Sequence, residues 1–222
     1  MNVEDKINFE EVRKEYENAG IDIDDLDEHP MSMFENWYAD ATKVVPGRWY
    51  EPNAMALATS DSSGRVSVRY VLLKGVSAEG IKFYSNYDSD KAIQLSENPQ
   101  CSVVFHWPYL GRQIRIEGTA EKTSRQDSEK YFHSRPRGSQ IGAAISNQSE
   151  TIESREILEQ KKESLVAELG NSTVPLPDNW GGYLIRPTRL EFWQGRLDRL
   201  HDRLVYSRED LSSPWKISRL SP

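Results

Sequence analysis

Three basic side chains, Arg199, His201 and Arg203, stand at alternate positions near the end of the chain. In extended backbone, alternate residues point to the same face, so the pattern predicts a cationic row along one strand. Such a row repels itself unless an anion or an electron-rich ring lies over it. A solvated strand face with ordinary surface arginines is the alternative, and it is commoner for an arbitrary strand. The aromatic pair Phe192-Trp193 precedes the row and favours a binding surface.

A second group of basic residues borders an apolar run in the first half of the chain. Arg69 and Lys74 enclose the run Tyr70-Val71-Leu72-Leu73. Their odd spacing places them on opposite faces of an ideal strand, which predicts that they serve two different anions. Lys91 falls early in an expected helix, where free backbone N–H groups also favour an anion.

Tyr131, Arg135 and Ser139 follow one another at intervals of four. The spacing aligns Tyr131 with Arg135 on one helix face, while Pro136 breaks the helix and leaves Ser139 in a loop. Two hydroxyls and a guanidinium that converge are typical donors to phosphate oxygens. Neutral groups that suit a polar heterocycle occur at Gln113, Gln148 and Ser149. Any one of these residues alone is more often plain surface, so the prediction depends on their combination.

The elements that must position these residues are mostly short strands separated by turn signals. The predicted strands are Ala54–Thr59, Arg65–Lys74, Ile81–Ser85, Cys101–Trp107, Gln113–Ala120, Trp180–Glu191, Asp202–Ser207 and Trp215–Arg219. Helices are predicted around Phe9–Asn18, from a capping box at Ser32 and Glu35 through Ala41, and over Asp88–Asn98, Ser124–Ser134 and Ser154–Leu169. Short strands with tight turns and inserted helices predict a mainly β, α+β fold, an antiparallel barrel decorated by helices.

The composition indicates one ordinary globular protein. Its 222 residues carry a formal net charge of −7, with 28% charged and 10% aromatic residues, and the mean hydropathy is −0.71. These values argue against wholesale nucleic-acid binding. Cys101 is the only cysteine, so we expect a reducing, cytoplasmic compartment. We expect neither a signal peptide nor a membrane span, because no apolar run is long enough.

Several common chemistries are not predicted. The four histidines and Cys101 lack the spacing of metal ligands, so no metal site is expected. The chain has no G-x-S-x-G elbow, which is the mark of one large class of hydrolases. It also lacks the glycine patterns of a classical dinucleotide fold and of a phosphate-binding P-loop.

Three motifs resemble the pyridoxine/pyridoxamine 5′-phosphate oxidase family. The segment Leu190-Glu191-Phe192-Trp193-Gln194, followed after four residues by Arg199-Leu200-His201-Asp202-Arg203, is similar to the family signature without a departure. Residues 69–74 resemble its flavin strand, and residues 131–142 its substrate-phosphate motif. Trp180-Gly181-Gly182 and residues 215–220 are also similar, so the resemblance covers nearly the whole chain from Arg13.

The resemblance implies an FMN-binding split β-barrel, homodimeric, with FMN at the subunit interface. The implied domains are a polar segment 1–29, which includes a possible active-site lid, and a split-barrel domain 30–222. The implied FMN-binding residues are Arg69, Tyr70, Val71, Leu72, Leu73, Lys74, Tyr84, Ser85, Lys91, Gln113, Gln148, Ser149, Trp193 and Arg203. The implied substrate-binding residues are Arg13, Tyr16, Lys74, Tyr131, Arg135, Ser139, Arg199, Leu200 and His201, of which Arg199 and His201 are expected to be catalytic.

The implied activity is oxidation of pyridoxamine or pyridoxine 5′-phosphate to pyridoxal 5′-phosphate. A hydride passes from C4′ to FMN, and O2 takes the electrons as hydrogen peroxide. Arg199 is expected to clamp the pyridine ring, and His201 either to handle a proton or to orient the substrate. Three alternatives remain: a related flavin oxidase acting on another aromatic substrate such as those of phenazine biosynthesis, a non-catalytic carrier of flavin or pyridoxal phosphate, and a barrel without a cofactor.

Two departures from the family pattern stand out. Asp90 occupies a position where family members commonly carry an arginine, so one contact to the FMN phosphate is expected to be missing. The stretch Asp22–Glu28 is acidic where some relatives are basic, which argues against a secondary anion site there.

Overall fold

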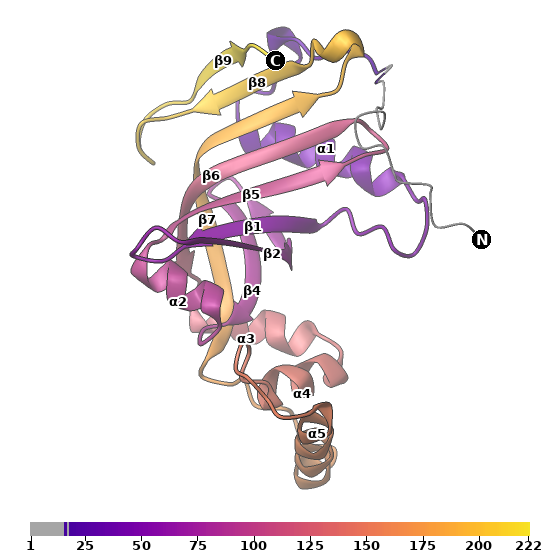
Figure 1. Ribbon diagram of the computed structural model, residues 1–222, viewed down its shortest axis with the longest axis vertical. Coiled ribbons are helices and arrows are strands. Elements are labelled where there is room, and N and C mark those ends of the chain that lie inside the picture. Colours follow the sequence, from indigo (N-terminus) through magenta and orange to yellow (C-terminus); the bar gives the residue numbers. More distant parts are fainter. Residues whose placement is uncertain (1–15, 17) are drawn as a thin grey trace, which may run out of the picture.

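The computed structural model describes Tyr16 and residues 18–222, and Figure 1 shows their arrangement. The helix expected around Phe9–Asn18 and the side chain of Arg13 therefore lie outside the described residues, apart from Tyr16 and Asn18. None of the helices in the described part is long and apolar enough to cross a membrane.

One curled antiparallel sheet forms the body of the molecule (Figure 1). Its strands run in the order β2-β1-β5-β6-β7-β4-β3, and β8 joins β7 to β9. The strands are β1 Ala54–Ser60, β2 Val66–Leu72, β3 Gly75–Ser77, β4 Gly80–Asn86, β5 Gln100–Trp107, β6 Arg112–Lys122, β7 Trp180–Gln194, β8 Asp202–Ser207 and β9 Lys216–Leu220. The predicted α+β, antiparallel fold is confirmed, and the β5–β6 hairpin stands where the sequence predicts it.

The long strand β7 links the two ends of the sheet. Residues 180–185 pair with β4, whereas residues 189–194 pair with β8. Between them the register against β6 shifts at Glu117/Gly118. A Cβ at Gly118 would lie 2.1 Å from the carbonyl oxygen of Arg186, so only glycine permits this close approach. The bulge lets one strand serve two differently oriented parts of the sheet.

The helix α1, Pro30–Lys43, closes the inner face of the sheet. Its buried face contains Phe34 and Trp37, whose rings meet Phe105 and Phe192 edge-on at 5.1 and 5.2 Å. The aromatic side chains on this face of α1 therefore pack in the core. The capping box expected at Ser32 is wrong, because the helix starts earlier: His29 Nδ1 accepts the N–H of Met31 and Pro30 takes the first helical position.

Four further α-helices lie beyond the sheet edge or against it. They are α2 Asp90–Glu97, α3 Arg125–Ser134, α4 Arg137–Ile145 and α5 Arg155–Leu169. The side chain of Ser124, expected to be the first helical residue, instead caps α3 by accepting the N–H of Asp127. The loop expected after Pro136 is wrong, because Pro136 is itself the N-cap of α4 and Ser139 lies in that helix. A proline ends one helix and begins the next, since its fixed φ suits a first turn.

Two expectations about the basic residues are also corrected. β2 ends at Leu72, and the chain turns through buried Leu73 before β3, so the strand alternation that separates Arg69 from Lys74 does not hold. Arg199 closes the 3-10 helix η2, Leu197–Arg199, with a left-handed φ of 60°. The strand β8 begins only at Asp202, so Arg199, His201 and Arg203 do not form one strand row.

Candidate functional site

A cavity of about 910 Å³ opens between the sheet and the helices α2, α3 and α4. It brings together two of the three groups that the sequence predicts to bind anions, the one around Arg69 and the one around Arg135, so that four cationic side chains line it. The predicted residues that line this cavity are Arg69, Tyr70, Val71, Leu72, Lys74, Tyr84, Ser85, Lys91, Tyr131, Arg135, Ser139, Gln148 and Ser149. The side chain of Leu73 instead packs in the core.

Lys91 is held inside this cavity by neutral acceptors. Its ammonium donates to Ser85 Oγ at 3.1 Å, to Ser89 Oγ at 2.9 Å and to Gln148 Oε1 at 2.9 Å. Only 8% of the residue is exposed. Burial, aided by the nearby charge of Arg69, lowers the pKa of Lys91 to about 8. A cation buried without a negative partner is a strong attractor for an anion that enters the cavity.

Hydrogen bonds fix the guanidinium of Arg69. Nη1 donates to Thr59 Oγ1 at 2.6 Å and to the Leu57 carbonyl at 3.2 Å, while Nη2 donates to Ser67 Oγ at 2.6 Å. Burial also lowers the pKa of Arg69. The guanidinium is therefore pre-oriented at the cavity wall.

Arg135 lies at the α3–α4 side of the same cavity. It caps α3, and its guanidinium lies over the Trp180 ring at 4.8 Å. Trp180 continues a stack with Tyr131 and Tyr84, in which the rings of the two tyrosines are 3.9 Å apart. The Nη1 atom of Arg135 is buried and has no hydrogen-bond partner among the described residues. A buried charged donor without an acceptor is costly, so an anion that reached this wall would be stabilised there.

Asp90 is the one acid on the cavity lining. Its backbone N–H donates to Ser149 Oγ at 3.3 Å, and Ser149 adopts a left-handed φ of 78°. The carboxylate acts on both neighbouring cations, since its charge raises the pKa of Arg69 and of Lys91 against the effect of burial. The departure noted in the sequence therefore falls beside the cations at the α2 end.

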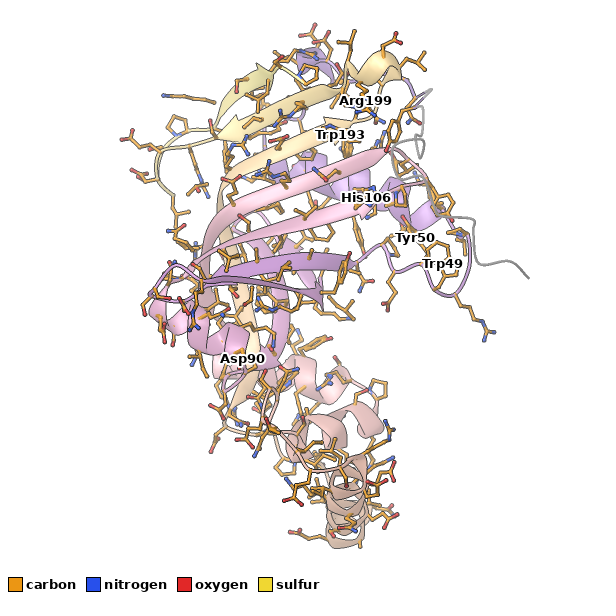
Figure 2. All side chains as sticks on the ribbon, in the orientation of Figure 1. Trp49, Tyr50, Asp90, His106, Trp193 and Arg199 are labelled. Carbon is orange, nitrogen blue, oxygen red and sulfur yellow. The ribbon has the colours of Figure 1, made fainter. Side chains whose placement is uncertain are left out.

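The remaining predicted residues gather elsewhere, on the outer face of β6, β7 and β8. Gln113 pairs with Trp193, and Trp193 pairs with Arg203, so the three form one row across the strands. His106 of β5 stands opposite Gln113 and extends the row. Figure 2 shows Trp193 and Arg199 at the end of the sheet far from Asp90. We call Gln113, Trp193 and Arg203 the outer row.

His201 lies against the outer row. Its ring is 4.6 Å from that of Trp193, and Tyr16 meets both rings edge-on at 5.6 and 5.9 Å. His201 Nδ1 accepts the backbone N–H of Arg196 at 3.0 Å. Burial, together with the charge of Arg199, lowers the pKa of His201. The imidazole is therefore neutral at neutral pH, with its proton on Nε2.

Tyr16 fits a notch made by two glycines. A Cβ at Gly195 would lie 2.5 Å from the Tyr16 ring, and one at Gly111 would lie 2.8 Å from it. Arg199 and Leu200, a few residues after Gly195, are exposed. The structure thus places Tyr16, Trp193, Arg199 and His201 in one neighbourhood, away from the cavity lining.

Two functional features escape the sequence analysis. Trp180 belongs to the Trp180-Gly181-Gly182 motif but was not predicted as a site residue, although its ring packs against the guanidinium of Arg135. Glu191 lies within the signature segment yet was not assigned a role, and only 2% of its side chain is exposed. An acid in the middle of a basic segment is the signal that could have identified Glu191.

A smaller hollow near the C-terminal strands contains two further arginines. Arg219 pairs with Asp22 at 2.9 Å and with Asp202 at 2.7 Å, while Arg196 pairs with Asp202 at 3.0 Å. Both cations of this hollow are thus already paired with carboxylates. No cluster of three or more potential metal ligands occurs among residues 16 and 18–222.

Two family models match the chain. One, described as pyridoxamine 5′-phosphate oxidase, matches residues 42–165. The other, described as the pyridoxine 5′-phosphate oxidase C-terminal dimerisation region, matches residues 180–222. The first contains every cavity-lining residue except Trp180, and the second contains Trp180 and most of the outer row.

Two relatives and a solved structure agree with these matches. A pyridoxine/pyridoxamine 5′-phosphate oxidase of Rhodopirellula baltica is 50% identical over 216 residues, 96% of each chain. One of Aliarcobacter butzleri is 47% identical over 95% of this chain and 98% of its own. The crystal structure of PhzG from Burkholderia lata, in complex with tetrahydrophenazine-1-carboxylic acid, superposes with a TM-score of 0.85 at 31% identity, covering 94% of this chain and all of that one.

Proposed function

The chain belongs to the pyridoxine/pyridoxamine 5′-phosphate oxidase family of FMN-dependent oxidoreductases, and from that premise we propose the reaction of this protein. It oxidises pyridoxamine 5′-phosphate and pyridoxine 5′-phosphate to pyridoxal 5′-phosphate. The observation that carries the proposal is a single cavity with two anion-binding walls, because the reaction needs the phosphates of both cofactor and substrate.

FMN fits the wall formed by Arg69, Ser85 and Lys91. The buried Lys91 ammonium is surrounded by neutral oxygens alone, so a phosphate would supply the missing negative charge. Tyr84, Gln148 and Ser149 line the cavity beside it and offer contacts to the ribityl chain. When bound, FMN would accept a hydride from C4′ of the substrate and pass the electrons to O2, giving hydrogen peroxide.

The substrate phosphate fits the wall formed by Tyr131, Arg135 and Ser139, with Lys74 across from it. The unpartnered Nη1 of Arg135 gains an acceptor when a phosphate oxygen arrives. The stack of Tyr131 on Tyr84 holds the phenol in place, so little freedom is lost on binding. Remote binding energy from this wall can then be used to align C4′.

We propose that the outer row completes the site from a second copy of the chain. The cavity lining of one chain contains none of Gln113, Trp193 and Arg203. The edge strand β2 beside the cavity exposes the apolar side chains of Val66, Val68 and Tyr70, at 70%, 67% and 78%. Such a row needs a cover, and the C-terminal dimerisation model supports a homodimer. Two half-sites on one chain make two complete sites in a two-fold dimer.

Arg199 and His201 would then act over the substrate ring. Arg199 is exposed at the end of η2, free to lie on the pyridine face and to stabilise charge that develops there. His201 is held with Nδ1 occupied by the Arg196 N–H, so its Nε2–H serves as a donor. This supports orientation of the substrate by a neutral imidazole rather than removal of a proton. Tyr16, in its glycine notch, supports a role for residues 1–29 as a lid.

The likeness to PhzG supports the related flavin oxidase as the second candidate. The ligand in that structure carries a carboxylate and no phosphate, so it could offer Arg135 an acceptor but not the oxygens of a phosphate ester. A carrier of flavin or pyridoxal phosphate would bind ligand at the same cavity without turnover. Preference for a phosphorylated substrate therefore separates the proposed reaction from the first rival, and peroxide production separates it from the second.

The direct test is aerobic turnover of the FMN-loaded protein on pyridoxamine 5′-phosphate. Pyridoxal 5′-phosphate and hydrogen peroxide should appear in step, and unphosphorylated pyridoxamine should react poorly. Tetrahydrophenazine-1-carboxylic acid serves as the competing substrate. Yellow protein that turns over only the phenazine, or neither substrate, would contradict the proposal.

A further inference from the structure

Glu191 is a buried carboxylate among three arginines on the outer face of the sheet. It lies on β7, two residues before Trp193, so both side chains point to the same face. Its cross-strand partners are Arg115 on β6 and Val205 on β8. Glu191 therefore lies on the same face as the outer row, next to Trp193 along β7.

The two oxygens of Glu191 are taken by different guanidinium groups. Oε1 accepts Nε–H of Arg203 at 2.8 Å, and Oε2 accepts Nη2–H of Arg189 at 3.0 Å. Arg115 Nη1 lies 3.6 Å from Oε2. Burial alone raises the pKa of Glu191, but the hydrogen bonds from Arg203 and Arg189 outweigh it and leave the pKa below its usual value. Glu191 is thus charged at neutral pH.

The contacts of Arg203 leave one edge of its guanidinium unused. Nε is committed to Glu191, and Nη1 donates to the carbonyl of Ser221 at 3.0 Å. Nη2 has no hydrogen-bond partner within the described part of the chain. A planar guanidinium fixed at two of its three nitrogens can present the third only in one direction.

We propose that Glu191 is a positioning residue for Arg203: its carboxylate fixes the guanidinium so that the Nη2 edge faces the flavin held in the partner's cavity. The inference rests on the proposed function, since it requires a flavin against the outer row. Glu191 itself does not touch the ligand, and its effect passes through Arg203. A fixed cation at the flavin both strengthens binding and favours the electron-rich reduced ring.

The variant Glu191→Gln tests this, with Glu117→Gln as its matched control. Glu117 accepts from Arg115 and Arg189, as Glu191 does, but it has no contact with Arg203. Apoprotein is titrated with FMN by flavin fluorescence, and the reduction potential of the bound flavin is measured. Glu191→Gln should weaken FMN binding about tenfold, as expected for loss of a charged hydrogen bond. Because Gln also removes a negative charge near the flavin, the potential is compared in Glu191→Asp, which keeps the charge and moves only the oxygens, and there it should fall. Glu117→Gln should leave both unchanged.

A double-mutant cycle identifies the route of the effect. In an Arg203→Ala background, Glu191→Gln should have no further effect on FMN affinity, and Glu191→Asp no further effect on the potential. An equal loss in both backgrounds, or an equal loss from Glu117→Gln, would overturn the inference while leaving the proposed function intact. An unchanged FMN affinity in Arg203→Ala alone would instead overturn the placement of the flavin, and both proposals with it. If Glu191→Gln does not fold, Glu191→Asp carries the same test, because it keeps the charge and moves only the oxygens.

Discussion

The cavity and the outer row bind in different ways, although both come from one sheet. The cavity residues are buried cations held by neutral partners, as in Lys91, or left without one, as in the Nη1 of Arg135. The outer row carries an arginine that already has its counter-ion, because Arg203 is paired with the buried Glu191. The cavity therefore carries uncompensated positive charge. In the outer row, by contrast, Glu191 balances the charge of Arg203 and already fixes the direction of its guanidinium.

This contrast assigns different tasks to the two regions. A cavity short of negative charge supplies affinity for phosphates, and its loss should appear in binding constants. A nearly neutral, rigid surface mainly supplies orientation over a ring, so loss of the groups beside it that face the substrate should appear in turnover, whereas Arg203 adds one contact to the flavin. The long strand β7 carries both, with Trp180 at the cavity end and Trp193 at the outer end.

The largest effect is expected from Arg199→Ala beside the outer row. Turnover should fall about a hundredfold or more, since the charge over the substrate ring is lost. FMN content should stay near that of the unchanged protein, because Arg199 is proposed to lie over the substrate ring and is not among the residues proposed to hold FMN. Steady-state kinetics and flavin absorbance measure the two quantities. Loss of FMN together with turnover would erase the proposed difference between the regions.

Arg135→Ala removes the unpartnered guanidinium from the cavity. The KM for pyridoxamine 5′-phosphate should rise about thirtyfold, the scale of a hydrogen bond to a charged group, while kcat changes much less. The KM for unphosphorylated pyridoxamine should not change. An unaltered KM for the phosphate ester would remove Arg135 from the substrate site.

The pKa of Lys91 gives the cavity a pH dependence that the outer row lacks. The folded protein without FMN binds this proton with a pKa of about 8, against an ordinary value of 10.5. An anion favours the protonated form, so FMN affinity should be constant just below pH 8 and fall up to about tenfold per pH unit above it. Between pH 8 and 10.5 the same group should make the FMN-free fold more stable, since burying a charged amine costs stability that deprotonation relieves.

Calorimetry in buffers of different ionisation enthalpy checks this directly. FMN binding at pH 8.5 or so should take up protons, and Lys91→Met should abolish the uptake. Proton release, or uptake unaffected by the substitution, would contradict the assignment of Lys91 to the phosphate.

The smallest effect is expected from Asp90→Arg, at the exposed end of the cavity. Replacing the acid with a cation should tighten FMN binding about fivefold, because an exposed pair contributes little. Asp90→Asn, which only removes the negative charge, should produce part of the gain. Weaker binding in Asp90→Arg would show that the acid supports the site, through Ser149, rather than opposing it.

The sequence predicted the positions of the strands better than it predicted which side chains share a face. Strand periodicity located β1, β5, β6 and β8 within a residue or two, and side-chain chemistry selected the cavity residues. It failed where a turn replaced regular structure: at Leu73, which brings Lys74 to the same cavity as Arg69, and at η2, where Arg199 takes a left-handed φ. Alternation holds only while the backbone remains extended, so a pattern read across a turn assigns the wrong face.

The periodicity of the sequence could not predict that the site residues divide between the cavity and the outer row. Arg203 and Arg69 look alike in the sequence, but one is paired across the sheet with Glu191 and the other faces a cavity. These partners lie on other strands, so the distinction depends on register and burial. The resemblance implied one flavin site that includes Arg69, Gln113, Trp193 and Arg203, without showing which of them a single chain brings together.

The most direct test of the account is activity of a mixed dimer. Arg135→Ala and Arg199→Ala chains with different tags are refolded together, and the mixed dimer is isolated. Turnover is measured at a pyridoxamine 5′-phosphate concentration near the wild-type KM, where both parent dimers are slow. If the cavity of one chain works with the outer region of its partner, the mixed dimer contains one doubly altered site and one intact site, and should recover about half of the wild-type turnover. If both regions of one chain served the same site, each site would carry one substitution, and at that concentration the mixed dimer would remain nearly as slow as its parents.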